Sequence, residues 1–166
     1  GGRRAYHAAK TDGNFERNGV SGMKPVDQKE LDRMLDMAYE AMEHAYVPYS
    51  GFQVGACLRA ASGKYYLGCN IENAAYSPTN CAERTAFFKA VSEGEREFSA
   101  VAVVGGYELD FKDYFAPCGV CRQVMAEFCN MKTFKVILGK NGGEFRVFTL
   151  EEILPFGFSP KDLTLK

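Results

Sequence analysis

Long apolar runs are missing from this sequence. Although 46% of its 166 residues are hydrophobic, no stretch reaches the ~18 to 20 residues that a membrane-spanning helix needs. Hydrophobic and charged residues instead occur in globular proportions, and a chain of this length buries roughly 70% of its unfolded surface. We therefore expect a soluble protein with a single domain over residues 25–166. Residues 1–24 read as an N-terminal extension, part of it a tag or targeting remnant.

Net charge is also nearly absent. Twenty Lys and Arg residues are balanced by 21 Asp and Glu residues, which gives a formal net charge of −1. Without a general positive field, the chain has little attraction for phosphate backbones or anionic lipid. We expect neither a nucleic-acid partner nor a membrane partner.

A secretory signal pattern is absent as well, which bears on the six cysteines. Disulfides belong to oxidising compartments, and Cys57 and Cys69 lie within apolar, strand-like segments. We interpret the cysteines as reduced thiols of a cytoplasmic protein.

The apolar periodicity predicts a sheet with helices on its faces. Apolar residues at three- and four-residue steps follow Asp27, which has the spacing of a capping box with Glu30. Then "FQVGACLRA" and "KYYLGCNIE" read as a hairpin around "ASG". The order continues with a helix over 81–93, the strand "FSAVAVVGG", a helix over 118–129, the strands "TFKVILG" and "EFRVFTL", and the short helix "TLEEILP". Helices and strands in this order predict one sheet in one domain.

Three cysteines lie at the starts of two predicted helices. Cys81 opens one helix, and Cys118 and Cys121 share the first turn of another. Unpaired backbone N–H groups and the helix dipole favour thiolates at such positions. If the two helix starts face each other, the thiolates converge on one point. A zinc ion held there would keep its fourth tetrahedral position open for water, as catalytic zinc does.

Other interpretations of Cys-x-x-Cys are a redox pair and half of a structural zinc site. A redox pair has no use for a third cysteine that adjoins Glu83. A structural site normally needs a fourth Cys or His, but His7 and His44 lie in unrelated segments and Cys129 lies at the far end of its helix. An open site is favoured, in which Glu83 handles the protons of the water. The alternative role of Glu83 is to complement the helix dipole.

The stretches "CAER" and "PCGVC" resemble the three-cysteine motif of the zinc-dependent nucleoside deaminases. The longer blocks "YSGFQVGACL", "GCNIENAAYSPTNCAERTAFFKAVSEG" and "ILPFGFSPKDL" are similar to the small homotetrameric cytidine deaminases. The resemblance implies a three-layer α/β/α sandwich with a mixed five-stranded sheet. It also implies one Zn²⁺ ion per chain on Cys81, Cys118 and Cys121. The implied reaction is hydrolytic deamination of cytidine and 2′-deoxycytidine to uridine and 2′-deoxyuridine, with release of ammonia, in pyrimidine salvage.

The resemblance also implies roles for the residues beside the metal. Glu83 would protonate the pyrimidine N3, take a proton from the water and deliver one to the departing amino group. Arg84 would donate hydrogen bonds to the ligand sulfurs and so offset the charge of three thiolates. A surface salt bridge is the alternative role of Arg84.

Substrate contacts are implied in the same way. Asn70 and Glu72 would bind the ribose 3′-OH. The base would be held by Phe52 against the pyrimidine ring and by the Ala82 N–H on the carbonyl O2. Tyr76 would line the pocket, and Phe158 of a neighbouring chain would pack against the base. From the residues alone, Asn70 and Glu72 are equally typical of a polar turn, and Phe52 of a core. Gly55 is expected to relieve crowding in this pocket.

The tail and the wider deaminase class leave alternatives open. Phe156 lies beside Phe158, so the choice between them rests on the spacing to "SPKDL", and both rings could instead fold back on their own chain. A blasticidin-type deaminase shares the zinc motif, but "NIEN" favours a sugar-containing substrate. A polynucleotide-editing deaminase needs a cationic channel, which the charge balance disfavours.

Overall fold

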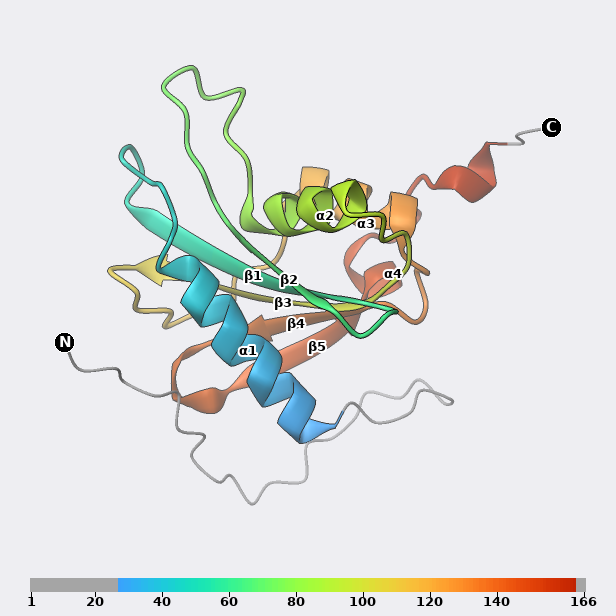
Figure 1. The fold of residues 1–166 in the computed structure, drawn as a ribbon, viewed down its shortest axis with the longest axis horizontal. Coiled ribbons are helices and arrows are strands. Elements are labelled where there is room, and N and C mark those ends of the chain that lie inside the picture. The colour runs from blue at the N-terminus through green and yellow to red at the C-terminus, as the bar shows by residue number, and fades with distance from the viewer. Residues whose placement is uncertain (1–26, 164–166) are drawn as a thin grey trace.

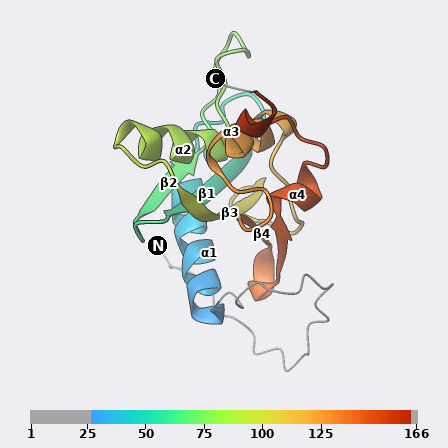
Figure 2. The same ribbon diagram turned by 90° about the vertical axis from the view of Figure 1, so that its right-hand side faces the viewer.

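The computed structural model describes residues 27–163, so the predicted extension over residues 1–24 lies outside the described part. A mixed five-stranded sheet in the order β2-β1-β3-β4-β5 forms the middle layer between helices (Figures 1 and 2). The strands are β1 (Phe52–Ala60), β2 (Tyr65–Cys69), β3 (Phe98–Tyr107), β4 (Lys135–Gly139) and β5 (Phe145–Thr149). β3 and β4 pair parallel, and the other neighbours pair antiparallel. The predicted three-layer sandwich is confirmed.

Helices cover the two faces of the sheet unequally. One face carries α1 (Gln28–Met42), and the other carries α2 (Ala82–Ser92) and α3 (Gly119–Phe128) (Figure 1). The short α4 (Leu150–Ile153) follows β5, and 3₁₀ turns lie at η1 (Asn141–Gly143) and η2 (Pro160–Asp162). No helix within residues 27–163 is long and apolar enough to cross a membrane.

Successive residues of the strands point alternately into the two core layers, one on each face of the sheet. Cys57 of β1 points towards α1, where it packs with Leu35, whereas its neighbour Leu58 points to the opposite face and packs in the layer of Phe87 and Met125. The continuous apolar run of β3 is buried on both faces, as predicted. The sheet therefore separates the core layer under α1 from the layer that contains residues of α2 and α3.

The start of α1 differs from the sequence prediction in one detail. Asp27 is the N-cap, but its side chain accepts a hydrogen bond from the Lys29 N–H at 3.2 Å. Glu30 does not close a capping box, because its carboxylate pairs with Arg59 Nε on β1 at 2.5 Å. This long-range ion pair replaces the local capping hydrogen bond and links α1 to the sheet.

Two glycines let helices approach the sheet closely. A Cβ on Gly55 would lie 1.9 Å from the Ala38 carbonyl oxygen of α1, and a Cβ on Gly68 would lie 2.2 Å from the Ala82 carbonyl oxygen of α2. The expectation that Gly55 relieves crowding in a substrate pocket is therefore wrong, because the group that needs the space is α1. Gly68 has the corresponding role beneath the first turn of α2, so it sets how low that turn sits on the sheet.

Candidate active site

The starts of α2 and α3 bring three sulfur atoms together. Cys81 is the N-cap of α2 and Cys118 the N-cap of α3, and neither side chain makes a capping hydrogen bond. The Sγ of Cys118 lies 3.8 Å from that of Cys81 and 3.6 Å from that of Cys121. All three sulfurs lie within 4.8 Å of one another. The predicted convergence of the two helix starts is confirmed.

This arrangement fits a zinc ion. Zn–S bonds of ~2.3 Å in a tetrahedral site place two sulfur ligands ~3.8 Å apart, close to the two separations observed. Cys121 is buried, Cys81 is half-buried and Cys118 is exposed, so the cluster opens to solvent on one side. Within residues 27–163, no fourth Cys, His, Asp or Glu joins the cluster. A fourth coordination position is thus left without a protein ligand.

Protons are unequally distributed among the sulfurs. Hydrogen bonds from the Cys121 thiol and from Arg84 lower the pKa of Cys81 to about 5. The same thiol-to-thiolate hydrogen bond, together with burial, raises the pKa of Cys121. A thiolate at Cys81 gives the cluster a negative charge that attracts a cation.

Glu83 lies in the first turn of α2 beside the cluster and is only 4% exposed. Burial is the main cause that raises the pKa of its carboxyl group to about 7, and the nearby Cys81 thiolate adds to it. Hydrogen bonds from its own backbone N–H and from Cys121 act in the opposite direction. The structure therefore places a buried, titratable carboxyl group next to the three sulfurs.

Arg84 turns towards the sulfurs rather than towards a carboxylate. Its Nη2 lies 3.6 Å from Cys81 Sγ and 3.4 Å from the carbonyl oxygen of Thr79. No ion pair in the described part of the chain includes it. Its Nε is buried and has no hydrogen-bond partner. The positive charge of Arg84 thus lies where the cluster is negative.

Asn70 holds the first residues of β1, and Glu72 holds the turn that precedes it. The amide of Asn70 accepts from the Val54 N–H and donates to the Phe52 carbonyl, both at 2.8 Å. The carboxylate of Glu72 accepts from the backbone N–H of Tyr49 at 2.9 Å and from the N–H and hydroxyl of Ser50. The Ser50 hydroxyl is the main cause that lowers the pKa of Glu72.

These contacts show what sequence reasoning missed. Tyr49 and Ser50 fix the orientation of Glu72, and their signals in the sequence were the turn-like stretch "PYSG" and their place in the block "YSGFQVGACL". Asn70 keeps one amide hydrogen, and the Glu72 oxygens keep lone pairs, for a further partner. The two side chains are brought together over one segment, residues 49–54, which also contains Phe52.

Phe52 lies between two other aromatic rings. Its ring contacts Tyr107 edge to face at 5.1 Å and Phe115 at 4.8 Å between centroids. The three rings line a cavity of about 280 Å³, to which Asp110 and Lys112 also contribute. Phe115 lies three residues before Cys118, so the aromatic group connects to the loop that enters the cluster. Sequence reasoning did not identify Tyr107 or Phe115.

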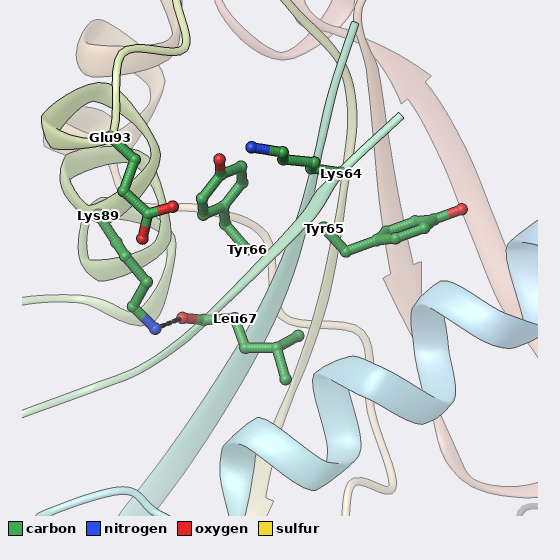
Figure 3. Close-up of a pocket in the computed structure, with 6 residues that line it drawn as sticks. All are labelled: Lys64, Tyr65, Tyr66, Leu67, Lys89 and Glu93. Atoms are coloured by element: carbon green, nitrogen blue, oxygen red, sulfur yellow. Dashed lines mark hydrogen bonds between the residues drawn. The ribbon is translucent and has the colours of Figure 1, made fainter. Parts of the chain in front are cut away.

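A larger cavity, of about 550 Å³, lies elsewhere, between β2 and α2 (Figure 3). It is lined by Lys64, Tyr65, Tyr66, Leu67, Lys89 and Glu93, none of which was predicted as a site residue. Lys89 Nζ donates to the Leu67 carbonyl at 2.5 Å (Figure 3). This lysine covers an open hydrogen-bonding edge of the sheet, which is a common protection against strand pairing.

The remaining predicted residues differ widely in burial. Ala82 is fully buried at the start of α2, whereas Tyr76 is 75% exposed and has a positive φ of 58°. Phe158 is 57% exposed and Phe156 fully exposed. The alternative in which both tail phenylalanines fold back into the core of their own chain is wrong.

Known proteins are similar to this chain in sequence and fold. A family model described as "Cytidine and deoxycytidylate deaminase zinc-binding region" matches residues 28–138. A cytidine deaminase of Sporosarcina psychrophila is 51% identical over 135 residues, covering 81% of this chain and 96% of that protein. One of Halalkalibacterium halodurans is 52% identical, covering 80% and 98%. The crystal structure of a cytidine deaminase from Burkholderia pseudomallei matches with a TM-score of 0.70 at 44% identity, covering 76% of this chain and 97% of that chain.

Proposed function

The chain belongs to the cytidine and deoxycytidylate deaminase family, and we propose that it converts cytidine and 2′-deoxycytidine to uridine and 2′-deoxyuridine with release of ammonia. The observation that carries this function is the meeting of three cysteine sulfurs within 4.8 Å beside the buried Glu83. Two relatives that share about half of the sequence are named cytidine deaminases. A thiol redox protein, a structural zinc protein and a blasticidin-type deaminase are not favoured by these relatives.

Cys81, Cys118 and Cys121 hold one zinc ion per chain. When bound, the ion supplies the Lewis acidity that activates the attacking water. Three thiolates leave such a site negatively charged, which opposes that activation. Arg84 offsets part of the charge, because its guanidinium group donates to Cys81 Sγ.

Glu83 carries the protons of the reaction. Its position in the first turn of α2, two residues after Cys81, keeps the carboxyl group beside the cluster and away from bulk water. In our assignment it takes a proton from the attacking water and passes it to the pyrimidine N3, and it then takes the second proton from the new C4 hydroxyl group and delivers it to the departing amino group. One buried group can serve these steps because N3 and the amino nitrogen are both bonded to C4, the carbon that the water attacks.

The nucleoside is held by groups around the cluster. Ala82 is the first residue of α2, so its N–H has no acceptor within the helix, and we assign it to the base carbonyl O2. Phe52 lies against the pyrimidine ring, Tyr76 lines the pocket, and Asn70 and Glu72 bind the ribose 3′-OH. The last two are suited to this because both already hold the segment that contains Phe52.

The site is completed by a second chain in this proposal. The Phe158 ring is more than half exposed on its own chain, and such a ring gains free energy when another apolar surface covers it. We propose a homotetramer in which Phe158 enters a neighbouring active site and packs against the base. The enzyme acts in pyrimidine salvage in the cytoplasm.

A combined zinc and turnover measurement tests the function. The purified protein should contain one zinc per chain, release ammonia from cytidine and lower the absorbance as uridine forms. Glu83→Gln is the matched control, because the amide keeps the shape and loses the proton carrier. It should keep zinc and lose at least the ~10² to 10⁴-fold of a general acid–base group. Full zinc without ammonia release would instead indicate a structural zinc protein, and a Cys118–Cys121 disulfide a redox protein.

A further inference from the structure

Two side chains that directly follow Cys121 fasten the C-terminal tail, residues 154–163, and the end of α4 that precedes it. Gln123 Nε2 donates to the carbonyl oxygen of Phe158 at 2.9 Å. Arg122 Nη1 donates to the carbonyl oxygen of Ile153 at the end of α4, and its Nε donates to that of Pro117 at 2.7 Å. The helix that supplies two of the three sulfurs therefore also holds the tail.

The contact from Gln123 fixes the backbone of Phe158 and leaves its ring free. On one side, the Gly157 N–H donates to the Leu154 carbonyl at 3.2 Å. On the other, the Ser159 N–H donates to Asp162 Oδ2 at 2.8 Å. Phe158 thus lies between two local turns, with its carbonyl held by α3, and the residue is 57% exposed.

An ordered backbone around an exposed aromatic ring does not stabilise an isolated chain. An exposed ring gains none of the free energy of burial, and ordering the backbone costs conformational entropy. The same order favours binding, because a group that is already positioned loses less entropy when it is covered. The ordered backbone and the exposed ring of Phe158 therefore favour contact with another chain.

We infer that Gln123 is a positioning residue that presents Phe158 to the active site of a neighbouring chain. This inference rests on the proposed function, and specifically on the shared site. Gln123 lies two residues after Cys121. One turn of α3 would therefore hold the metal of its own site and position the Phe158 ring that enters the neighbouring site. Arg122 has a less selective role, because it also touches Pro117, which precedes Cys118.

Gln123→Glu is the informative substitution, because it keeps the side-chain length and removes the N–H donor. We expect the KM for cytidine to rise by no more than the ~2- to 12-fold that loss of an aromatic contact gives. Zinc per chain and kcat should stay close to the parent values. Gln123→Lys restores a donor and should bring the KM back towards the parent value. Glu127→Gln, an exposed change one turn further along α3, is the matched control and should leave the KM unchanged.

A mixing experiment tests whether Gln123 acts on the neighbouring site. Mixed with Glu83→Gln chains, Gln123→Glu chains keep their own intact Glu83 and receive some tails with an intact Gln123. The KM of the mixture should therefore fall towards the parent value. As a control, Gln123→Glu chains mixed with chains that carry both substitutions should show no such fall. If the KM stays raised in the first mixture as well, Gln123 acts on its own chain and the inference is overturned.

Phe158→Ala distinguishes failure of the inference from failure of the proposed function. If Phe158→Ala raises the KM and Gln123→Glu does not, the inference is wrong and the shared site stands. If neither changes the KM, the shared site and the inference both fail. Loss of zinc or of thermal stability in Gln123→Glu, with an unchanged KM, would show a purely structural role and also overturn the inference.

Discussion

In the metal half of the proposed site, three sulfurs lie within 4.8 Å of one another and Glu83 is 4% exposed. In the recognition half, Tyr76 is 75% and Phe158 57% exposed. In our proposal both halves serve one reaction, yet only the first is assembled within a single chain. The difference fits our proposal that the starts of two helices organise the chemical step, whereas contact with the base depends on assembly.

The halves differ because they rest on different supports. The start of α2 is packed on Gly68 of β2, where no Cβ could be accommodated, so its position is set by the core. Tyr76 lies in a loop and contacts Tyr49 through rings 6.2 Å apart. Phe158 is attached through one carbonyl. Substitutions should therefore have large effects in the metal half and graded effects in the recognition half.

Cys118→Ala should have the largest effect, although Cys118 is the most exposed of the three proposed ligands. We expect loss of zinc, loss of turnover to background and a lower melting temperature, because metal binding contributes directly to the stability of the folded state. Cys69→Ala is the control, since its sulfur bonds to the His44 carbonyl away from the cluster, and it should keep zinc. Zinc analysis after gel filtration measures both, and a full zinc content in Cys118→Ala would remove Cys118 from the ligand set.

Glu72→Ala should come next, with a KM for cytidine at least about tenfold higher and zinc unchanged. A charge-assisted hydrogen bond to the ribose is worth ~1.5 to 3 kcal/mol, which sets this magnitude. The assignment to the 3′-OH is tested with 3′-deoxycytidine. The parent should discriminate against it, and Glu72→Ala should not. Equal discrimination by both proteins would place Glu72 away from that hydroxyl.

Asn70→Ala should raise the KM similarly but differ in stability. Its amide bonds to the backbone of both Phe52 and Val54, and each lost hydrogen bond is worth ~1 kcal/mol. Glu72 holds an exposed turn, where water can replace it. Chemical denaturation should therefore show a larger stability loss for Asn70→Ala than for Glu72→Ala.

How much the sequence predicts depends on how far apart along the chain the interacting residues lie. Cys118 and Cys121 are one helical turn apart, so local spacing was sufficient to place both sulfurs together. The approach of Cys81 followed from the two helix starts only if they face each other, and the motif resemblance supported that condition. Glu72 binds a turn 22 and 23 residues earlier, and no local pattern encodes that pairing. Gly55 was assigned to the wrong neighbour because a strand pattern does not say which helix will cover it.

Phe158→Ala should raise the KM by about 2- to 12-fold, since an aromatic contact is worth ~0.5 to 1.5 kcal/mol beyond area burial. Zinc should be unchanged, because the ring is not part of the cluster. Phe158→Leu keeps apolar volume and should fall between the parent and Phe158→Ala. Mixtures of Phe158→Ala and Glu83→Gln chains should recover activity through sites that receive both intact parts. An active monomer in sedimentation would contradict a shared site.

The smallest effect is expected at Phe156, the other exposed ring of the tail. Phe156 has a positive φ of 56° in the turn closed by the Gly157 N–H and the Leu154 carbonyl. A residue with a Cβ is strained there by roughly 1 kcal/mol, and glycine is not. Phe156→Gly should therefore be about 1 kcal/mol more stable to chemical denaturation than Phe156→Ala, which keeps the strain. Both should keep the parent KM, because Gln123 holds the carbonyl of Phe158 and not that of Phe156. A KM raised by Phe156→Gly as much as by Phe158→Ala would place Phe156 against the base.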